Sequence, residues 1–289
     1  NFFILMFIWL ASYPKSGNTL VRSLLSSYFF SKDGIYNFNL TKNIKQFPNI
    51  KLFENLGIDI TNKKEVIANY IRVQQSFNKK ESTQFLKTHS YLFNIENNAF
   101  TDLNVSLGAI YIVRDPRNVV TSFANHSSIS IDESTNFLIN EWVLGGNFNS
   151  FNYTEKTTLY SGTWATNYKS WKSFKSQGKY LLIKYEDLVN EKEETLLKIL
   201  KFIYKLNKKN FELDQVKFKN TIDSTSFERM KTLEEKIGFD ESKVDKKTGK
   251  KIPFFNLGKE NDWKKMITPT IRKKIENAFK EEMEELGYL

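Results

Sequence analysis

The sequence has no cysteine, and only two of its 289 residues are histidine. The absence of cysteine excludes disulfide bonds, thiolate catalysis and zinc held by cysteine. The two histidines, His89 and His126, also argue against a metal centre built from imidazoles, so we expect no metal. Any chemistry must therefore use lysine, serine, a carboxylate or one of these two histidines.

The sequence also lacks an apolar run long enough to cross a bilayer. Its longest apolar stretch, residues 1–11, is about half of the ~20 residues that a membrane-spanning helix needs. No basic segment precedes this stretch and no small-residue cleavage site follows it, as a signal peptide would require. We expect a buried strand here, no transmembrane segment and a cytoplasmic protein.

No internal repeat and no low-complexity linker divides the chain, which predicts one domain over residues 1–289. Two polar and aromatic stretches without a regular pattern, about 37–82 and 127–162, are interpreted as helical insertions into that domain. A lysine-rich stretch at about 236–262 is interrupted by three glycines and is interpreted as a lid loop.

The formal net charge of +10 indicates a surface that attracts anions. Charge does not select among them, since nucleic acid, a lipid headgroup and a small phosphorylated ligand all fit. No recognised nucleic-acid-binding motif accompanies the charge, so we expect no nucleic-acid partner. The motifs must decide which anion binds.

Three apolar runs, residues 2–11, 108–113 and 180–185, predict buried strands. The first two lead into residues with helical spacing, beginning near Thr19 and after Pro116. Continuous rather than alternating apolar strands are typical of a parallel sheet covered by helices on both faces. The sequence therefore predicts an α/β protein with a three-layer, P-loop-like fold, in which helices flank a central, mainly parallel sheet.

A loop of seven residues, Tyr13-Pro14-Lys15-Ser16-Gly17-Asn18-Thr19, joins the first strand to its helix. Backbone N–H groups and the helix dipole form an anion site at such a turn, and Lys15 adds a full charge. The loop is not a Walker loop, in which the lysine follows the second glycine, because Lys15 precedes the only glycine here. An ordinary strand-to-helix turn with an exposed lysine would show the same local pattern.

Arg114 follows the second strand, and Ser122 lies eight residues later on the predicted helix. A guanidinium at a strand end can bind a phosphate through its planar fork of donors. The alternative is a local ion pair between Arg114 and Asp115 that caps the helix. The sequence is equally compatible with both interpretations.

A short apolar stretch, Phe85-Leu86-Lys87-Thr88-His89, ends in a lysine and a histidine. A lone histidine is usually structural, but an imidazole with a pKa near ~6.5 can take a proton from a hydroxyl. His126 lies beyond the helix after Arg114 and is the weaker candidate of the two histidines.

Together these motifs resemble the cytosolic type of the PAPS-dependent sulfotransferase family, and the chain looks like a bacterial-like member. The resemblance extends along most of the chain, and the seven-residue loop, similar to the family's 5′-phosphosulfate loop, is its most specific part. It implies transfer of a sulfuryl group from 3′-phosphoadenosine 5′-phosphosulfate (PAPS) to an acceptor hydroxyl or amine, without a metal. It assigns binding of the 5′-phosphosulfate to Lys15, Ser16, Gly17, Asn18 and Thr19.

The resemblance also implies roles outside this loop. His89 would be the general base, and Lys15 and Lys87 would offset charge on the sulfuryl and leaving groups. Arg114 and Ser122 would bind the 3′-phosphate. The other nucleotide contacts that it implies are Tyr185, Thr225, Ser226, Phe227, Gly258 and Lys259.

The chain departs from the family pattern in several places. Leu20 stands where a tryptophan that stacks on adenine is common, and Asn256 and Leu257 replace the Arg-Lys pair before Gly258. A cation for this loop would then come from a nearby lysine such as Lys259. The family's dimer segment is only partly matched, so the oligomeric state is left open.

Two other functions stay open. A P-loop kinase of a small molecule conflicts with the order of residues in the loop, whereas a nucleotide-binding protein that has lost turnover is consistent with the departures. Because Lys15, Lys87 and His89 are all present, we expect an enzyme that acts on a small-molecule or glycan acceptor. Similar bacterial proteins tend to begin near Met6, so residues 1–5 are interpreted as preceding the natural start.

Overall fold

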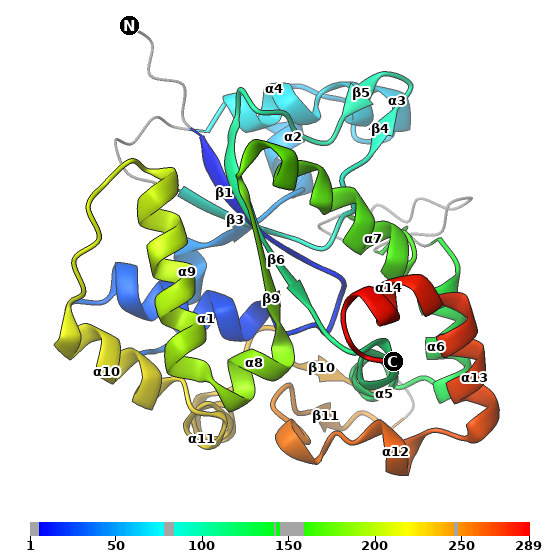
Figure 1. Ribbon diagram of the computed structural model, residues 1–289. Coiled ribbons are helices and arrows are strands. Elements are labelled where there is room, and N and C mark those ends of the chain that lie inside the picture. The colour runs from blue at the N-terminus through cyan, green and yellow to red at the C-terminus, as the bar shows by residue number, and fades with distance from the viewer. Residues whose placement is uncertain (1–5, 78–83, 142, 145–158, 246–247) are drawn as a thin grey trace, which may run out of the picture.

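The computed structural model describes residues 6–77, 84–141, 143–144, 159–245 and 248–289. Figure 1 shows a central sheet with helices on both sides of it. Within the described ranges, no helix is both long enough and apolar enough to cross a membrane. The predicted α/β fold with a flanked central sheet is confirmed.

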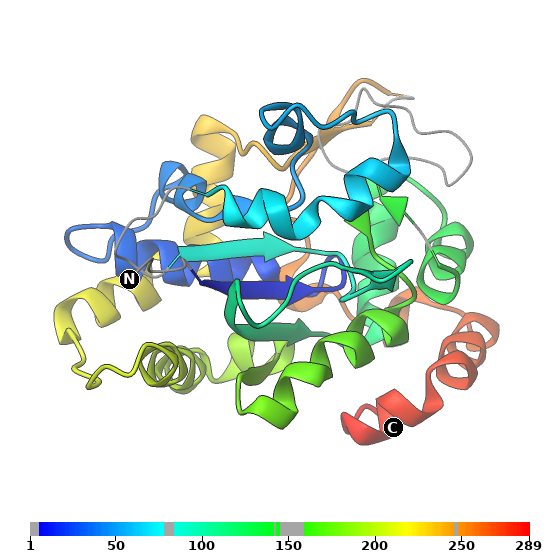
Figure 2. The same cartoon turned by 90° about the horizontal axis from the view of Figure 1, so that it is seen from above.

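Five strands form one sheet in the order β2-β3-β1-β6-β9, and all four pairings are parallel. The strands are β1 (Phe7–Ser12), β2 (Lys45–Gln46), β3 (Gln84–Thr88), β6 (Ser106–Val113) and β9 (Tyr180–Lys184). Long connections join them, as parallel neighbours require. The long arrows of β1, β3 and β6 point the same way in Figure 2, and all pairings of the sheet are parallel, so the carboxyl ends of the strands meet at one edge of the sheet.

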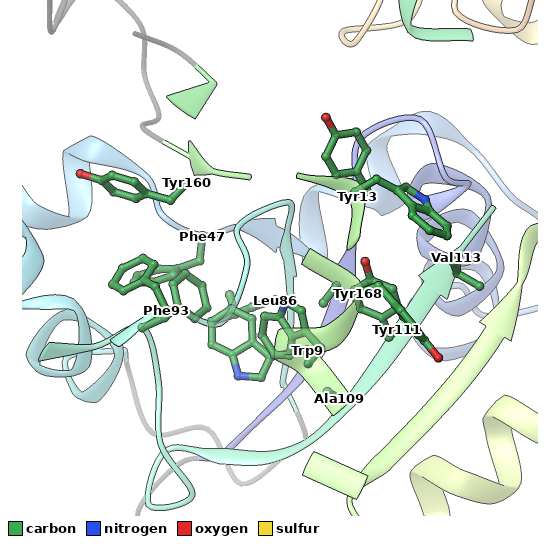
Figure 3. Close-up of a cluster of buried hydrophobic side chains, with 14 of the residues drawn as sticks. Trp9, Tyr13, Phe47, Leu86, Phe93, Ala109, Tyr111, Val113, Tyr160 and Tyr168 are labelled. Atoms are coloured by element: carbon green, nitrogen blue, oxygen red, sulfur yellow. The ribbon is translucent and has the colours of Figure 1, made fainter. Parts of the chain in front are cut away.

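Successive side chains of β1 enter two large cores on opposite faces of the sheet. Trp9 belongs to the first core and Ile8 to the second, and both are fully buried. The first core is rich in aromatic residues, with ring centroids of Trp9 and Phe47 5.8 Å apart, and part of it is drawn in Figure 3. Burial of side chains of this size contributes about 1.5–3 kcal/mol each. Because both faces are covered, the central strands β1 and β6 are apolar along most of their length.

The helices divide between these two cores. The first core packs against α2 (Ile50–Glu54), α3 (Lys63–Ala68), α4 (Tyr70–Gln75), α5 (Pro116–Ser127), α6 (Ile131–Ile139), α7 (Trp164–Trp171), α13 (Pro269–Ala278) and α14 (Lys280–Glu285). The second packs against α1 (Asn18–Phe30), α8 (Tyr185–Asn190), α9 (Lys192–Leu206) and α10 (Gln215–Ser224). Helices α11 (Phe227–Ile237) and α12 (Trp263–Met266) complete the described set. Tyr185, predicted as the end of a strand, begins α8 instead.

The predicted insertions and lid contain short elements. The first insertion holds η1 (Phe38–Asn43), β2 and α2 to α4, and the second holds α6 and the hairpin of β7 (Val143–Leu144) and β8 (Leu159–Tyr160). The predicted lid holds the hairpin of β10 (Lys243–Val244) and β11 (Lys251–Ile252), then η3 (Gly258–Glu260). Remaining elements are β4 (Asn94–Ile95), β5 (Asn98–Ala99) and η2 (Lys172–Gln177). Residues 78–82, 142, 145–158 and 246–247 of these predicted segments lie outside the described residues.

Candidate active site

The motifs predicted from sequence meet at the carboxyl edge of the sheet. The loop after β1 holds Lys15, β3 contains Lys87 and leads to His89, Arg114 follows β6, and Tyr185 follows β9. The four strands are neighbours in the order β3-β1-β6-β9. Parallel pairing therefore brings residues that are far apart in the sequence to one edge, where α/β proteins bind their ligands.

The loop after β1 has the backbone of an anion-binding turn. Gly17 has a φ of 101° and Lys15 a φ of 64°, and α1 begins directly after Gly17. A Cβ atom at Gly17 would lie 2.5 Å from a ring carbon of Tyr185, so glycine is required for this close approach. Within the described residues, the buried Ser16 hydroxyl has no hydrogen-bond partner. A helix start with a spare donor is a place where an anion can bind.

Arg114 is buried beside this loop without a carboxylate partner in the described part of the chain. Its Nη1 donates to the Lys15 carbonyl at 3.2 Å, and its guanidinium lies 4.1 Å from the centre of the Tyr185 ring. Its Nε is buried and finds no acceptor there. Asp115 instead pairs with Arg117 at 2.7 Å and caps α5, so the alternative of a local ion pair between Arg114 and Asp115 is wrong.

His89 is oriented by the strand end next to it. Its Nδ1 lies 2.9 Å from the Ser12 carbonyl oxygen and 3.2 Å from the Ser12 hydroxyl. A carbonyl can only accept, so Nδ1 carries the proton and Nε2 keeps its lone pair. Burial, with the nearby Lys87 ammonium, lowers the pKa of His89 to about 3. The imidazole is therefore neutral at physiological pH and can act as a base.

Lys15 lies under the segment that was predicted as a lid. Its Nζ is 4.1 Å from the centre of the Phe254 ring, which covers it from the side of β11. Burial lowers the pKa of Lys15 to about 7, and repulsion from Arg114 and Lys87 acts in the same direction. Glu241 opposes this change but does not outweigh it. The contact with Phe254 was not predicted from the sequence.

Two charged residues that the sequence analysis missed, Arg22 and Glu241, join the site. Glu241 accepts a hydrogen bond from the Thr19 hydroxyl at 2.9 Å, forms an ion pair with Arg22, and lies 3.5 Å from the Lys87 ammonium. Burial raises the pKa of Glu241, but Lys87 and Arg22 outweigh burial and hold the pKa well below its ordinary value. Glu241 is therefore a carboxylate among the cations of the site.

The segments predicted to contact the nucleotide pack against one another. A Cβ atom at Gly258 would lie 2.7 Å from the Phe227 ring, so these two segments are in contact. The Thr225 side chain is fully buried and donates to the Thr221 carbonyl at 2.6 Å. Ser226 caps the start of α11. Two of the three predicted residues in this stretch thus also stabilise local helix structure.

The chain after Gly258 docks on α5 next to the predicted 3′-phosphate residue Ser122. Thr121 donates to the Asn261 side chain at 2.6 Å, and the Asn261 amide donates to the Asn118 carbonyl at 3.0 Å. Ser122 itself is half-buried. The side chain of Lys259 lies outside the described part of the structure.

The second histidine lies close to the same cluster. The ring of His126 is 5.7 Å from that of Phe254, and its buried Nδ1 has no partner among the described residues. Burial, followed by repulsion from Lys15, lowers the pKa of His126 to about 3. His126 thus lies near Phe254 and Lys15, although the sequence analysis made it the weaker candidate of the two histidines.

Solved structures of known proteins share this fold at low sequence identity. Mouse sulfotransferase SULT7A1, complexed with PAP, matches with a TM-score of 0.55 and 18% identity over 96% of this chain and 84% of the mouse chain. Retinol dehydratase, complexed with retinol and PAP, matches with a TM-score of 0.60 and 15% identity over 96% of this chain and 80% of its own. These likenesses show the fold.

Curated relatives are also sulfotransferases. Sulfotransferase 2A1 of Rattus norvegicus is 26% identical over 71% of this chain and 66% of the rat protein, so the match spans just under two thirds of that relative. Sulfotransferase 1E1 of Homo sapiens is 24% identical over 96% of this chain and 83% of the human protein. The sulfotransferase domain model matches residues 7–287. With its motifs assembled at one sheet edge, the chain belongs to the sulfotransferase domain family.

Proposed function

We propose that the protein transfers the sulfuryl group of PAPS to a hydroxyl or amine of an acceptor. The observation that carries this proposal is Arg114, a buried guanidinium whose Nε has no partner in the described residues. The Asp115 carboxylate already pairs with Arg117. The Arg114 guanidinium, next to the loop that holds Lys15, therefore remains available to bind a ligand. Both solved neighbours are complexes with PAP, which supports a bisphosphate nucleotide as the ligand.

The residues fit a ligand with two anionic ends. Ser16 and the start of α1 offer donors for a 5′-phosphosulfate, and Arg114 with Ser122 offers donors for a 3′-phosphate. Tyr185 contacts both proposed anion sites, because its ring packs against Gly17 of the first site and against the Arg114 guanidinium of the second. The ring therefore holds the two anion sites at a fixed separation.

The nucleoside would be held by the segments packed beside α5 and α11. Phe227 offers an aromatic face next to Gly258, on a chain that has Leu20 in place of the usual tryptophan. Thr225, Ser226 and Lys259 complete the proposed contacts. The Phe227 ring would stack on adenine and so take the place of the tryptophan that is common at position 20, where this chain has Leu20.

The side chains of the site suit in-line transfer. His89 Nε2 accepts the proton of the acceptor group as its bond to sulfur forms, and the bond from sulfur to the bridging oxygen breaks. Adenosine 3′,5′-bisphosphate leaves with the electron pair of that bond, and His89 passes the proton to solvent. Lys15 and Lys87 offset the charge on the bridging and sulfuryl oxygens. A bound anion near Lys87 also weakens the repulsion that lowers the pKa of His89, which makes the imidazole a stronger base.

A cavity of about 410 Å³ next to Glu241 is the proposed acceptor site. Its wall combines apolar and uncharged polar groups with four cations and two carboxylates: Arg22, Phe38, Thr41, Lys42, Ile44, Lys45, Gln46, Asn49, Lys51, Leu52, Phe239, Asp240 and Glu241. Luciferin sulfotransferase and 3-beta-hydroxysteroid sulfotransferase are among the curated relatives, which supports a small-molecule acceptor. The lysines favour an acceptor that carries an acidic group on an apolar body.

The proposal is tested by calorimetric titration with adenosine 3′,5′-bisphosphate, with 5′-AMP as the ligand that lacks the 3′-phosphate. We expect the wild type to bind the bisphosphate far better than 5′-AMP. Arg114→Ala should weaken bisphosphate binding by about 10- to 100-fold, because a charged hydrogen bond to phosphate is lost, and leave 5′-AMP nearly unchanged. Arg72→Ala, which removes an exposed arginine from α4, is the charge-matched control.

If neither nucleotide binds to the wild type, the proposed function is wrong. Bisphosphate binding without transfer from PAPS to any acceptor would favour the nucleotide-binding protein that has lost turnover. Transfer that disappears in His89→Ala, while bisphosphate affinity is kept, would support the assignment of the general base. Phosphoryl transfer from ATP would instead support the kinase.

A further inference from the structure

The carboxylate of Glu241 stands where the proposed donor needs cations. It accepts from the Thr19 hydroxyl at 2.9 Å and lies 3.5 Å from the Lys87 ammonium. These two residues are the proposed partners of the 5′-phosphate and of the sulfuryl group. Arg22 binds the same carboxylate oxygen that faces Lys87. The Glu241 carboxylate thus binds the same hydrogen-bond donors and cations that the 5′-phosphosulfate of the donor would need.

The turn that carries Glu241 is firmly attached to the protein. Phe239 is buried in a cluster with Tyr36 and Phe255, and its ring centroid lies 4.5 Å from that of Phe38. The Ser242 hydroxyl donates to Glu234 on α11. The backbone of residues 239–242 is therefore placed by its own packing, and the position of the Glu241 carboxylate does not depend on chance contacts of an exposed loop.

The Glu241 side chain nevertheless has room to adopt another conformation. Its relative exposure is 28%, against 9% for Arg22 and 8% for Lys87, and it lines the 410 Å³ cavity. Rotation of this flexible side chain toward solvent would free Thr19, Arg22 and Lys87 together. The cost is the loss of its ion pairs, which a phosphosulfate with more charge can replace.

We propose that Glu241 is an internal competitor for the 5′-phosphosulfate site, and that its carboxylate must leave Thr19, Arg22 and Lys87 before the donor can bind there. This inference rests on the proposed function and adds a residue that sets donor affinity. It also gives Arg22 a role, as a cation released to the donor. In the free protein Glu241 offsets the repulsion between two buried cations, Arg22 and Lys87.

The test measures binding of adenosine 3′,5′-bisphosphate, 5′-AMP and 3′-AMP to wild type and to Glu241→Gln. Glutamine keeps the shape but not the charge, so affinity for the bisphosphate and for 5′-AMP should rise by about tenfold. Affinity for 3′-AMP, which has no 5′-phosphate, should change by less than about twofold. Asp240→Asn is the matched control, because it removes the same charge from the adjacent exposed residue.

The outcomes separate this inference from the proposed function. If the wild type binds the bisphosphate but Glu241→Gln and Asp240→Asn behave alike, Glu241 is not a competitor and only this inference is wrong. Weaker binding in Glu241→Gln would also overturn it, since Glu241 would then help to hold the ligand. Failure of the wild type to bind the bisphosphate would sink the proposed function itself.

A second measurement on the wild type covers the case in which the variant does not fold. The carbon-13 resonance of the Glu241 carboxylate should shift when 5′-AMP binds, because the carboxylate leaves Arg22 and Lys87, and should not shift with 3′-AMP at equal saturation. A shift of equal size with both nucleotides would contradict the inference. This experiment needs no substitution in the cation cluster.

Discussion

Lys15 is a proton-binding group as well as a cation. Its pKa of about 7 in the free protein, caused mainly by burial, leaves most of it neutral at pH 8. A bound phosphosulfate favours the ammonium form and raises the pKa, so ligand binding takes up a proton above pH 7. Affinity for adenosine 3′,5′-bisphosphate should therefore fall as the pH rises from 7 to 9. Titration at pH 8 in buffers of different ionisation enthalpy should show uptake of close to one proton.

Lys15→Arg is the control for this proton uptake. A guanidinium stays charged at any pH used, so this variant should bind without taking up a proton and with a flatter pH dependence. The assignment to Lys15 would be wrong if the variant took up as many protons as the wild type. Lys87, whose pKa burial also lowers, would then be the next group to test.

Among the residues of the candidate site, those that belong to a continuous sequence motif were predictable from the sequence. Lys15, His89 and Arg114 each stand in a stretch of five or more characteristic residues, and the structure brings them to one sheet edge. Glu241 and Arg22 could not be found in this way, because no local pattern marks them. Their roles come from a contact between α1 and a turn more than 200 residues later.

Substitution of Gly17 tests the unit formed by β1, the loop after it and α1. At a φ of 101°, an alanine would be strained by about 1–3 kcal/mol, and its Cβ would also press on the Tyr185 ring. Gly17→Ala should therefore lower the stability and also weaken bisphosphate binding by more than tenfold, because ring and loop must separate. Urea unfolding and calorimetry measure the two effects.

Gly178→Ala separates backbone strain from the effect on the site. Gly178 has a φ of 64° and open space where a Cβ would be, so this variant should lose about 1 kcal/mol of stability. Its bisphosphate affinity should equal that of the wild type. Unchanged affinity in Gly17→Ala would show that the contact with Tyr185 does not shape the site.

Elements with a continuous apolar run were predictable, and short polar ones were not. Strands β1, β6 and β9 overlap the predicted runs, and β1 and β6 are buried on both faces. Strand β2 is only Lys45 and Gln46, and its place beside β3 comes from tertiary packing rather than from its sequence. The same holds for the hairpin of β10 and β11, in which two of the four strand residues are lysines.

Arg117 joins distant parts of the molecule. Its buried guanidinium pairs with Asp115 at 2.7 Å and Glu276 at 2.5 Å, donates to the Tyr288 carbonyl at 2.7 Å, and lies 4.0 Å from the centre of the Trp263 ring. Arg117→Met would leave the buried Asp115 carboxylate without its ion-pair partner. We expect a loss of about 3–5 kcal/mol in the free energy of unfolding, measured in urea.

Arg272→Met is the matched control, since Arg272 pairs with the same Glu276 from an exposed position on α13. That exposed pair should contribute no more than about 0.5 kcal/mol. Similar small losses in both variants would mean that Arg117 does not hold the molecule together. A large loss in Arg117→Met alone would show that α5 and the C-terminal helices unfold as one unit.

The last turn of the chain is tied to the exits of two central strands. The Tyr288 hydroxyl donates to Glu186 at 3.0 Å, Glu186 accepts from the Asp115 backbone at 3.2 Å, and Lys184 donates to the Leu286 carbonyl. Cleavage after Glu285 would therefore remove the contacts of Leu286 and Tyr288 and loosen the proposed nucleotide site, although none of residues 286–289 is proposed to touch the nucleotide. A protein prepared for binding measurements should keep these four residues.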